Sequence, residues 1–167
     1  MMGAGKSTVG RSLAARLGVT FVDLDRRIER IEGRAIPTLF QDQATFRALE
    51  TRALQGLTLE PGWAASGAVV ATGGGVVLSE TNWALMEESG VTVCLEVSPA
   101  TLVRRLRSPS ARRERPLLRG DDLGGTVQQL LDARSPLYRR ASLVVDADGP
   151  VDAVCDRLLR SLGPDHD

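Results

Sequence analysis

The chain has 167 residues, which is enough for one domain with a substantial core and too few for two ordinary domains. Its 21 Lys and Arg residues balance 21 Asp and Glu residues, so no net charge favours nucleic acid or an anionic membrane surface as a partner. No apolar run approaches the roughly 20 residues of a membrane span, and no signal-peptide pattern opens the chain. We therefore expect a single cytoplasmic domain over residues 1–167, with neither nucleic acid nor membrane as a partner.

The two cysteines suggest no structural chemistry. Cys94 and Cys155 lie far apart, without CxxC spacing and without a nearby histidine. This pattern predicts neither a disulfide framework nor a zinc site. We interpret both as buried thiols in a reducing compartment.

Helices and short apolar strands alternate along the chain. In order, the pattern predicts a helix at 7–17, a strand at 19–23, helices at 26–32 and 44–57, a strand at 67–72, a helix at 81–88, a strand at 91–97, a helix that starts at Pro99, a helix at 127–134, a strand at 143–145 and a helix at 151–162. The βα alternation indicates an α/β fold with a mostly parallel sheet and helices on both faces.

A glycine-rich loop precedes the first helix, and it matches the end of the Walker A pattern GxxxxGK[ST]. Its glycines let backbone amides curl around phosphates, and the helix start adds its dipole. The only lysine of the chain, Lys6, would reach the outer phosphates, and the Ser7 hydroxyl would bind Mg²⁺. The sequence thus predicts an ATP site formed by Gly3, Ala4, Gly5, Lys6, Ser7 and Thr8.

The loop lacks its usual beginning in this sequence. The first glycine of the pattern would fall one residue before Met1, and the strand that normally leads into the loop would come before that glycine. Burial of about five apolar residues is worth roughly 1.5–3 kcal/mol each, so this strand matters for the fold. Two interpretations compete: a gene model that starts at an internal methionine, or a shortened protein that no longer binds nucleotide properly.

Three groups of residues suggest an acceptor side. Asp23 and Asp25 stand two apart at the end of a predicted strand and point toward the carboxyl edge of the sheet, where one could bind the metal and the other could hold or deprotonate an acceptor hydroxyl. An N-cap aspartate plus a surface aspartate is the alternative. Arg47 and Glu50 share a helix face, so Glu50 could orient the guanidinium toward a carboxylate, although an ordinary surface pair has the same spacing. The triplet Gly73, Gly74 and Gly75 predicts that the backbone there packs closely against a neighbouring group.

An arginine-rich stretch, about residues 107–122, interrupts the alternation. It is longer than an ordinary connection, and either a solvated loop or a lid that closes over ATP would explain it. A lid would bring positive charge to the transferred phosphate and exclude water. Arg115, which Pro116 stiffens, is the best candidate within it.

The chain resembles the shikimate kinase family, through the pieces GAGKSTVGRSLAARLG, FVDLDRRIE, FRALE, ATGGGVVL, RPLL and RSPLYRRA in family order. The resemblance implies a P-loop NTPase-like three-layer sandwich with a mostly parallel five-stranded sheet, its first strand truncated, and an Arg-rich lid. It also implies a monomer that transfers phosphate from ATP to shikimate with Mg²⁺, yielding shikimate 3-phosphate on the way to chorismate and aromatic amino acids.

The resemblance also assigns residues. Asp25 would bind hydroxyls of shikimate, Arg47 and Arg134 would hold its carboxylate, and the Gly73 to Gly75 backbone would line the pocket. Asp23 would approach Mg²⁺ through water. The catalytic set would then be Lys6, Asp25 and Arg115, with Arg107 against adenine.

The sequence departs from the family at the missing first strand and at 41–45, which is shorter than usual and lacks a Gly-Glu pair. Two other functions stay open. A gluconate-type kinase would share the phosphate loop, and a regulatory domain could keep the family surface without nucleotide binding.

Overall fold

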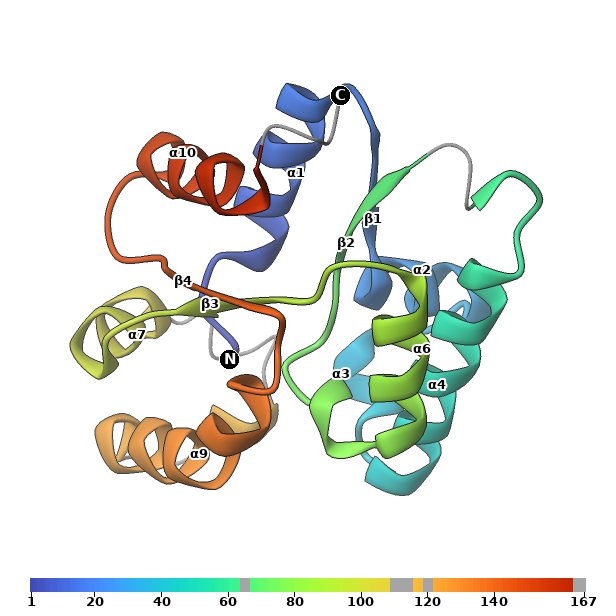
Figure 1. The fold of residues 1–167 in the computed structure, drawn as a ribbon. Helices are drawn as coiled ribbons and strands as arrows, with labels where there is room; N and C mark the ends of the chain where they lie inside the picture. The colour runs from blue at the N-terminus through green and yellow to red at the C-terminus, as the bar shows by residue number, and fades with distance from the viewer. Residues whose placement is uncertain (64–66, 109–115, 119–121, 164–167) are drawn as a thin grey trace.

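The computed structural model describes residues 1–63, 67–108, 116–118 and 122–163 (Figure 1). Its helices and strands alternate much as the sequence pattern predicts. They are, in order, α1 (Lys6–Leu17), β1 (Thr20–Asp23), α2 (Leu24–Glu32), α3 (Ile36–Leu39), α4 (Gln43–Thr58), β2 (Ala68–Ala71), η1 (Val76–Leu78), α6 (Glu80–Ser89), β3 (Val93–Glu96), α7 (Pro99–Leu106), η2 (Pro116–Leu118), α9 (Leu123–Tyr138), β4 (Leu143–Asp146) and α10 (Val151–Leu162).

The strands form two separate parallel pairs. β1 pairs with β2 from Thr20 opposite Ala68 to Asp23 opposite Ala71, and β3 pairs with β4 from Val93 opposite Leu143 to Glu96 opposite Asp146. Helical crossovers make the pairs parallel. In the described residues no ladder joins the pairs, so the expected single five-stranded sheet is not confirmed, whereas the α/β class and the parallel direction are.

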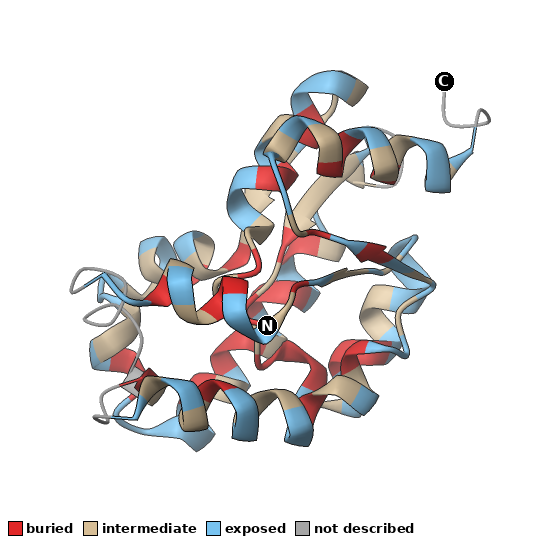
Figure 2. Cartoon of the chain, turned by 90° about the vertical axis from the view of Figure 1, so that its left-hand side faces the viewer, coloured by how far each residue is buried: buried red, intermediate tan, exposed pale blue. Residues whose placement is uncertain are grey.

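Helices cover the strands from both sides. α1 contacts β1, β2 and α10, and α10 also packs on β4. On the other side, α4 packs against both α2 and α6, while α7 and α9 pack together beside β3 and β4 (Figure 1). Buried residues gather on the inner faces of these helices (Figure 2). This arrangement agrees with the predicted layers.

Local sequence signals explain where most helices begin and end. α1 stops at Gly18, whose φ of 68° suits glycine and whose N–H bonds back to Ala14. Ser98 and Asp42 cap α7 and α4 with their side chains.

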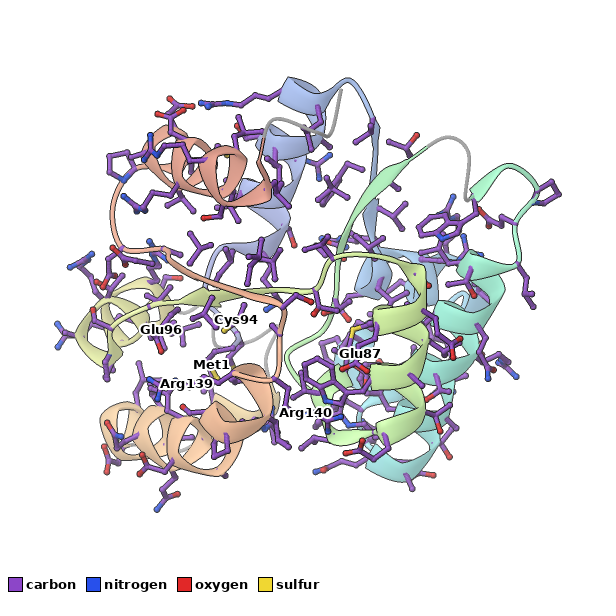
Figure 3. All side chains as sticks on the ribbon, in the orientation of Figure 1. Met1, Glu87, Cys94, Glu96, Arg139 and Arg140 are labelled. Carbon is purple, nitrogen blue, oxygen red and sulfur yellow. The ribbon has the colours of Figure 1, made fainter. Side chains whose placement is uncertain are left out.

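Two helices differ from the sequence prediction. The short α3 has Pro37 in its first turn and was missed because four residues show no periodicity. α9 is longer than expected: Asp122 caps it at its start, and it continues past Pro136 to Tyr138. Next to its end, Arg139 pairs with Glu96 of β3 at 2.9 Å (Figure 3).

Candidate active site

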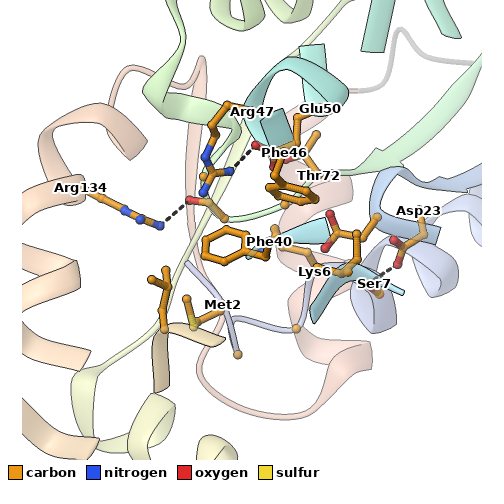
Figure 4. Close-up of a pocket in the computed structure, with 18 of the residues that line it drawn as sticks. Met2, Lys6, Ser7, Asp23, Phe40, Phe46, Arg47, Glu50, Thr72 and Arg134 are labelled. Atoms are coloured by element: carbon orange, nitrogen blue, oxygen red, sulfur yellow. Dashed lines mark hydrogen bonds and ion pairs between the residues drawn. The ribbon is translucent and has the colours of Figure 1, made fainter. Parts of the chain in front are cut away.

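A cavity of about 270 Å³ opens where β1 and β2 end and α1 begins (Figure 4). Residues from five α-helices (α1, α2, α3, α4 and α9), from η2 and from the glycine triplet line it. The residues around it are Met2, Gly3, Gly5, Lys6, Ser7, Thr8, Asp23, Asp25, Ile36, Phe40, Phe46, Arg47, Glu50, Thr72, Gly73, Gly74, Gly75, Leu117 and Arg134. The cavity therefore brings the predicted phosphate loop and the predicted acceptor residues to one place.

The phosphate loop has a backbone that only glycine adopts easily. Gly3 and Gly5 have φ of 75° and 93°, in the left-handed region. A Cβ on Gly3 would also meet the Leu106 side chain at 3.0 Å. Within the described residues no side-chain hydrogen bond caps the start of α1 after Gly5, and the amides at a helix start are suited to bind an anion. Lys6 Nζ, next along the loop, donates to the Met1 carbonyl at 2.7 Å.

Arg105 holds the phosphate loop through hydrogen bonds to its backbone, a role that was not predicted from the sequence. Its guanidinium donates to the carbonyls of Gly3, Ala4 and Ala147, each at 3.3 Å. Only the fold reveals this, because the residue is one of several arginines in a row. Arg107, the predicted adenine contact, is the exposed residue that follows α7, and it does not line the described cavity.

Asp23 sits at the junction of β1 and α2. One carboxylate oxygen accepts from the Ser7 hydroxyl at 2.6 Å, and the other accepts from the Arg26 amide at 3.2 Å (Figure 4). Asp23 is thus the N-cap of α2, which agrees with the alternative interpretation of this aspartate as a helix cap. It also lines the cavity, so the capping role does not remove it from the site.

Asp25 belongs to the first turn of α2 and not to the strand end. Its Oδ1 is buried and has no hydrogen-bond partner within the described structure. Burial, and then the neighbouring Asp23 carboxylate, raises the pKa of Asp25 above the usual range. A buried carboxylate oxygen without a donor is costly, so this oxygen is suited to accept a hydrogen bond from a ligand.

Arg47 and Glu50 form an ion pair on α4, as their spacing predicts. Glu50 is only 1% exposed, and burial raises its pKa although the Arg47 guanidinium opposes this shift. The guanidinium carbon also lies 5.4 Å and 5.3 Å from the ring centres of Phe40 and Phe46. The pair and the rings fix Arg47 at the cavity wall (Figure 4). Neither Phe40 nor Phe46 was among the predicted site residues.

The glycine triplet is close to both arginines. The Gly74 carbonyl accepts from the Tyr138 hydroxyl at 2.6 Å and from Arg134, which is 9% exposed, at 3.3 Å. A Cβ at Gly75 would clash with the Arg47 guanidinium. At Gly73, a Cβ would lie 2.6 Å from a Glu50 oxygen and 3.0 Å from Asp25 Oδ1. Larger residues would therefore displace the charged groups of the cavity.

The predicted lid falls mostly outside the described residues. Arg115 is among these undescribed positions, so its role stays a prediction. Within the described part, Leu117 of η2 lines the cavity and Leu118 is buried. The described part of this segment therefore reaches the site at η2.

The oxygen donors at Ser7 and Asp23 fit magnesium, a hard cation that prefers oxygen. The described residues contain no group of three potential metal-binding side chains. Magnesium usually keeps several waters and binds through one or two protein groups plus phosphates. The donor set therefore fits a Mg²⁺ that is held together with a nucleotide.

A phosphate loop that shares a cavity with two arginines and a buried carboxylate defines an ATP-dependent kinase of a small anionic molecule. The model of one family, described as shikimate kinase, matches residues 2–163. The chain belongs to the shikimate kinase family, whose members are phosphotransferases.

Relatives and solved structures agree with this assignment. A shikimate kinase of Parasynechococcus marenigrum is 43% identical over 166 residues, which cover 97% of this chain and 82% of that protein. A structure of Acinetobacter baumannii shikimate kinase in complex with shikimate matches with a TM-score of 0.84 and 32% identity, covering 96% of this chain and 88% of the other. The Bacteroides thetaiotaomicron enzyme matches with a TM-score of 0.84 and 34% identity, covering 96% and 93%.

Among the described residues, none of the helices has both the length and the apolar character that a membrane crossing requires.

Proposed function

We propose that this chain transfers the γ-phosphoryl group of ATP to a hydroxyl of shikimate, with the cavity residues in the roles given below. The observation that carries the proposal is the convergence of Arg47, Arg134 and the orphaned oxygen of Asp25 on the cavity that the phosphate loop also lines. Shikimate carries a carboxylate and several hydroxyls. Two arginines from different helices suit the carboxylate, and a buried carboxylate suits a hydroxyl.

Arg47 and Arg134 bind the carboxylate of the substrate. Glu50 holds Arg47, and the Gly74 carbonyl holds Arg134, so both guanidinia are positioned before a ligand arrives. Each guanidinium has five donors, and one held contact leaves others for a carboxylate. Preorganisation of this kind reduces the entropy that binding costs.

Asp25 binds the acceptor hydroxyl and takes its proton. Burial raises the pKa of Asp25, which makes its carboxylate a stronger base than that of an exposed aspartate. Asp25 accepts the proton as the hydroxyl oxygen bonds to the γ-phosphorus and ADP leaves. The amides at the start of α1 and the Lys6 ammonium hold the phosphates during this step.

Ser7 and Asp23 face the magnesium that accompanies the nucleotide. The metal neutralises phosphate charge when it is bound. Arg115 over the transferred phosphate and Arg107 near adenine complete the proposal from the sequence resemblance. A cytoplasmic enzyme agrees with ATP as donor and with the free thiols of Cys94 and Cys155, and a monomeric state stays a prediction.

A coupled assay of ADP release tests the acceptor assignment, with shikimate and gluconate compared on the same protein. We expect turnover of ATP with shikimate as the acceptor and none with gluconate. Arg134→Met should raise the KM for shikimate by about 100-fold or more, because one charge of the substrate loses its partner, and should leave the KM for ATP unchanged. Arg139→Ala, in the exposed pair just beyond the same helix, is the matched control and should change neither constant. Equal effects on both substrates, or preferred use of gluconate, would refute the assignment.

A further inference from the structure

A tyrosine of α9 holds the glycine triplet by its backbone. The hydroxyl of Tyr138, the last residue of α9, donates to the Gly74 carbonyl at 2.6 Å. Tyr138 is only 9% exposed, and it is not among the residues that line the described cavity of the site. Any action of this hydroxyl on a ligand in the cavity would therefore pass through the Gly74 peptide.

The Gly74 carbonyl has a second donor in Arg134, whose guanidinium lies 3.3 Å away (Figure 4). A carbonyl oxygen has two lone pairs, so it can accept from both groups. Bonds from a charged donor are normally shorter than bonds between neutral groups, and a typical N–H···O bond measures about 2.9–3.0 Å. Here the neutral hydroxyl makes the short bond and the charged guanidinium makes the long one. The tyrosine thus occupies the better position at this oxygen.

The long bond matters because Arg134 is buried. The residue is 9% exposed, so water contributes little to the solvation of its charge. A guanidinium in such a place gains from an acceptor at normal distance, and the Gly74 carbonyl can provide one. Without the Tyr138 hydroxyl, this carbonyl would take the guanidinium as its main donor, since a buried carbonyl that loses a donor is costly. Arg134 would then be drawn toward the triplet and away from a ligand in the cavity.

The Tyr138 hydroxyl remains a donor at neutral pH. Burial raises the pKa of Tyr138 above its usual value of about 10, although the Arg134 charge opposes this shift. The hydroxyl therefore keeps its proton in the conditions under which a kinase is assayed.

Contacts beyond the end of α9 fix the place of this hydroxyl. Arg140, two residues after Tyr138, pairs with both carboxylate oxygens of Glu80 at 2.6 and 3.0 Å. Its guanidinium carbon also lies 4.7 Å from the ring centre of Trp83. Glu80 and Trp83 belong to α6, so these contacts tie the end of α9 to a second helix. The tyrosine is thus presented to Gly74 from an anchored position.

We propose that Tyr138 is a positioning residue for carboxylate recognition: its hydroxyl engages the Gly74 carbonyl and thereby leaves the Arg134 guanidinium free to bind the carboxylate of the substrate. This inference rests on the proposed function, in which Arg134 binds that carboxylate. The ring of Tyr138 serves the packing of the fold, whereas its oxygen serves recognition of the acid. The hydroxyl has no part in binding ATP or in the transfer of the phosphoryl group.

Tyr138→Phe tests this, because it keeps the ring and removes only the hydroxyl. We expect the KM for shikimate to rise by about tenfold, while the KM for ATP and kcat change by less than about twofold. Trp83→Phe is the matched control, because it also removes a buried donor to a backbone carbonyl, that of Val77 at 3.0 Å, and Trp83 does not line the described cavity of the site. Both variants should lower the Tm, but Trp83→Phe should keep the KM for shikimate within about twofold of the unchanged protein. A similar rise in both variants, or no rise in Tyr138→Phe, would overturn the proposal.

A double-mutant cycle shows whether the tyrosine acts through Arg134. In Arg134→Met no guanidinium is left to compete for the Gly74 carbonyl. Adding Tyr138→Phe to this variant should therefore change the KM for shikimate by less than about twofold. A further rise of about tenfold would mean that the two residues act independently, which contradicts the proposed role.

Crystal structures of the unchanged protein and of Tyr138→Phe, both without ligand, give a readout that needs no substrate. The distance from the Arg134 guanidinium to the Gly74 oxygen should shorten in the variant from 3.3 Å to about 2.9–3.0 Å. An unchanged distance would show that the hydroxyl does not control Arg134. If the unchanged protein has no turnover with shikimate, the proposed function fails, while this distance still decides the role of Tyr138. The two proposals can therefore fail separately.

Discussion

Removal of the Arg47 charge should destabilise the fold through its partner Glu50. The Glu50 side chain is 1% exposed and paired with Arg47, and its second oxygen has no hydrogen-bond partner in the described structure. Arg47→Met keeps much of the apolar contact with Phe40 and Phe46 but leaves a buried carboxylate alone. Loss of one partner of a buried pair costs about 3–5 kcal/mol. Because the Arg47 side chain is 24% exposed, we expect about 2–3 kcal/mol at neutral pH, or a Tm lower by roughly 5–10 °C.

This cost should depend on pH. Burial already raises the pKa of Glu50 above the value of about 4.3 expected in an unfolded chain, and loss of Arg47 raises it further. A raised carboxyl pKa gives stability that is fully present below the unfolded value and is lost as the pH rises through the folded value. The variant therefore approaches the wild type below about pH 4.5 and falls behind it increasingly toward neutral pH.

Urea unfolding at several pH values measures this, with Glu50→Gln and the double variant Arg47→Met/Glu50→Gln completing a double-mutant cycle. The double variant should recover to within about 1 kcal/mol of the wild type, since no charge is left buried. It should still bind shikimate as poorly as Arg47→Met, because the substrate arginine is gone. A constant loss across the pH range, or a double variant no more stable than Arg47→Met, would refute the reasoning.

Two further substitutions test other contacts of the site. Arg105→Ala removes the hydrogen-bond donors to the Gly3 carbonyl, so it should raise the KM for ATP by about tenfold without a comparable change in the KM for shikimate. The control Arg104→Ala, on the same helix, should leave the steady-state kinetics almost unchanged. Equal effects of the two variants would show that Arg105 does not hold the loop. Gly75→Ala forces a methyl group against the Arg47 guanidinium and should lower the affinity for shikimate, measured by calorimetry, at least about tenfold. The control Gly56→Ala, in α4, has room for the methyl group and should keep the affinity of the unchanged protein. Unchanged affinity in Gly75→Ala would contradict the close approach of Arg47 to this glycine.

Features with a local cause could be predicted from the sequence. The phosphate loop follows from a short run of glycines before an amphipathic helix, and two of these glycines have the left-handed backbone that glycine adopts easily. The Arg47 and Glu50 pair follows from helical spacing, which sets side chains three apart on one face. Such inferences need only the geometry of one element. These inferences are correct whenever the helix or strand itself has been predicted correctly.

Contacts between distant segments could not be predicted in this way. Arg105 reaches Gly3 across 102 positions, and Tyr138 reaches the Gly74 carbonyl across 64. Neither has a periodic signal, because the chosen partner depends on how helices pack. Asp25 is an intermediate case: the sequence put it at the right edge of the sheet, but α2 already begins at Leu24, so Asp25 lies in a helical turn and not at the end of a strand. Its burial, which sets its pKa, emerges only from packing.

The separation of the two strand pairs also bears on substrate recognition. Arg47 stands on α4, which packs with α2 beside the β1 and β2 pair, whereas Arg134 stands on α9, which packs with α7 beside β3 and β4. The two proposed carboxylate-binding groups thus stand beside different strand pairs. After β2, the Gly74 carbonyl accepts hydrogen bonds from Arg134 and Tyr138, and the adjacent Gly75 lies close to the Arg47 guanidinium. The spacing of the two guanidinia therefore depends on the distance between the two strand pairs, so a substitution that shifts one pair relative to the other should weaken shikimate binding.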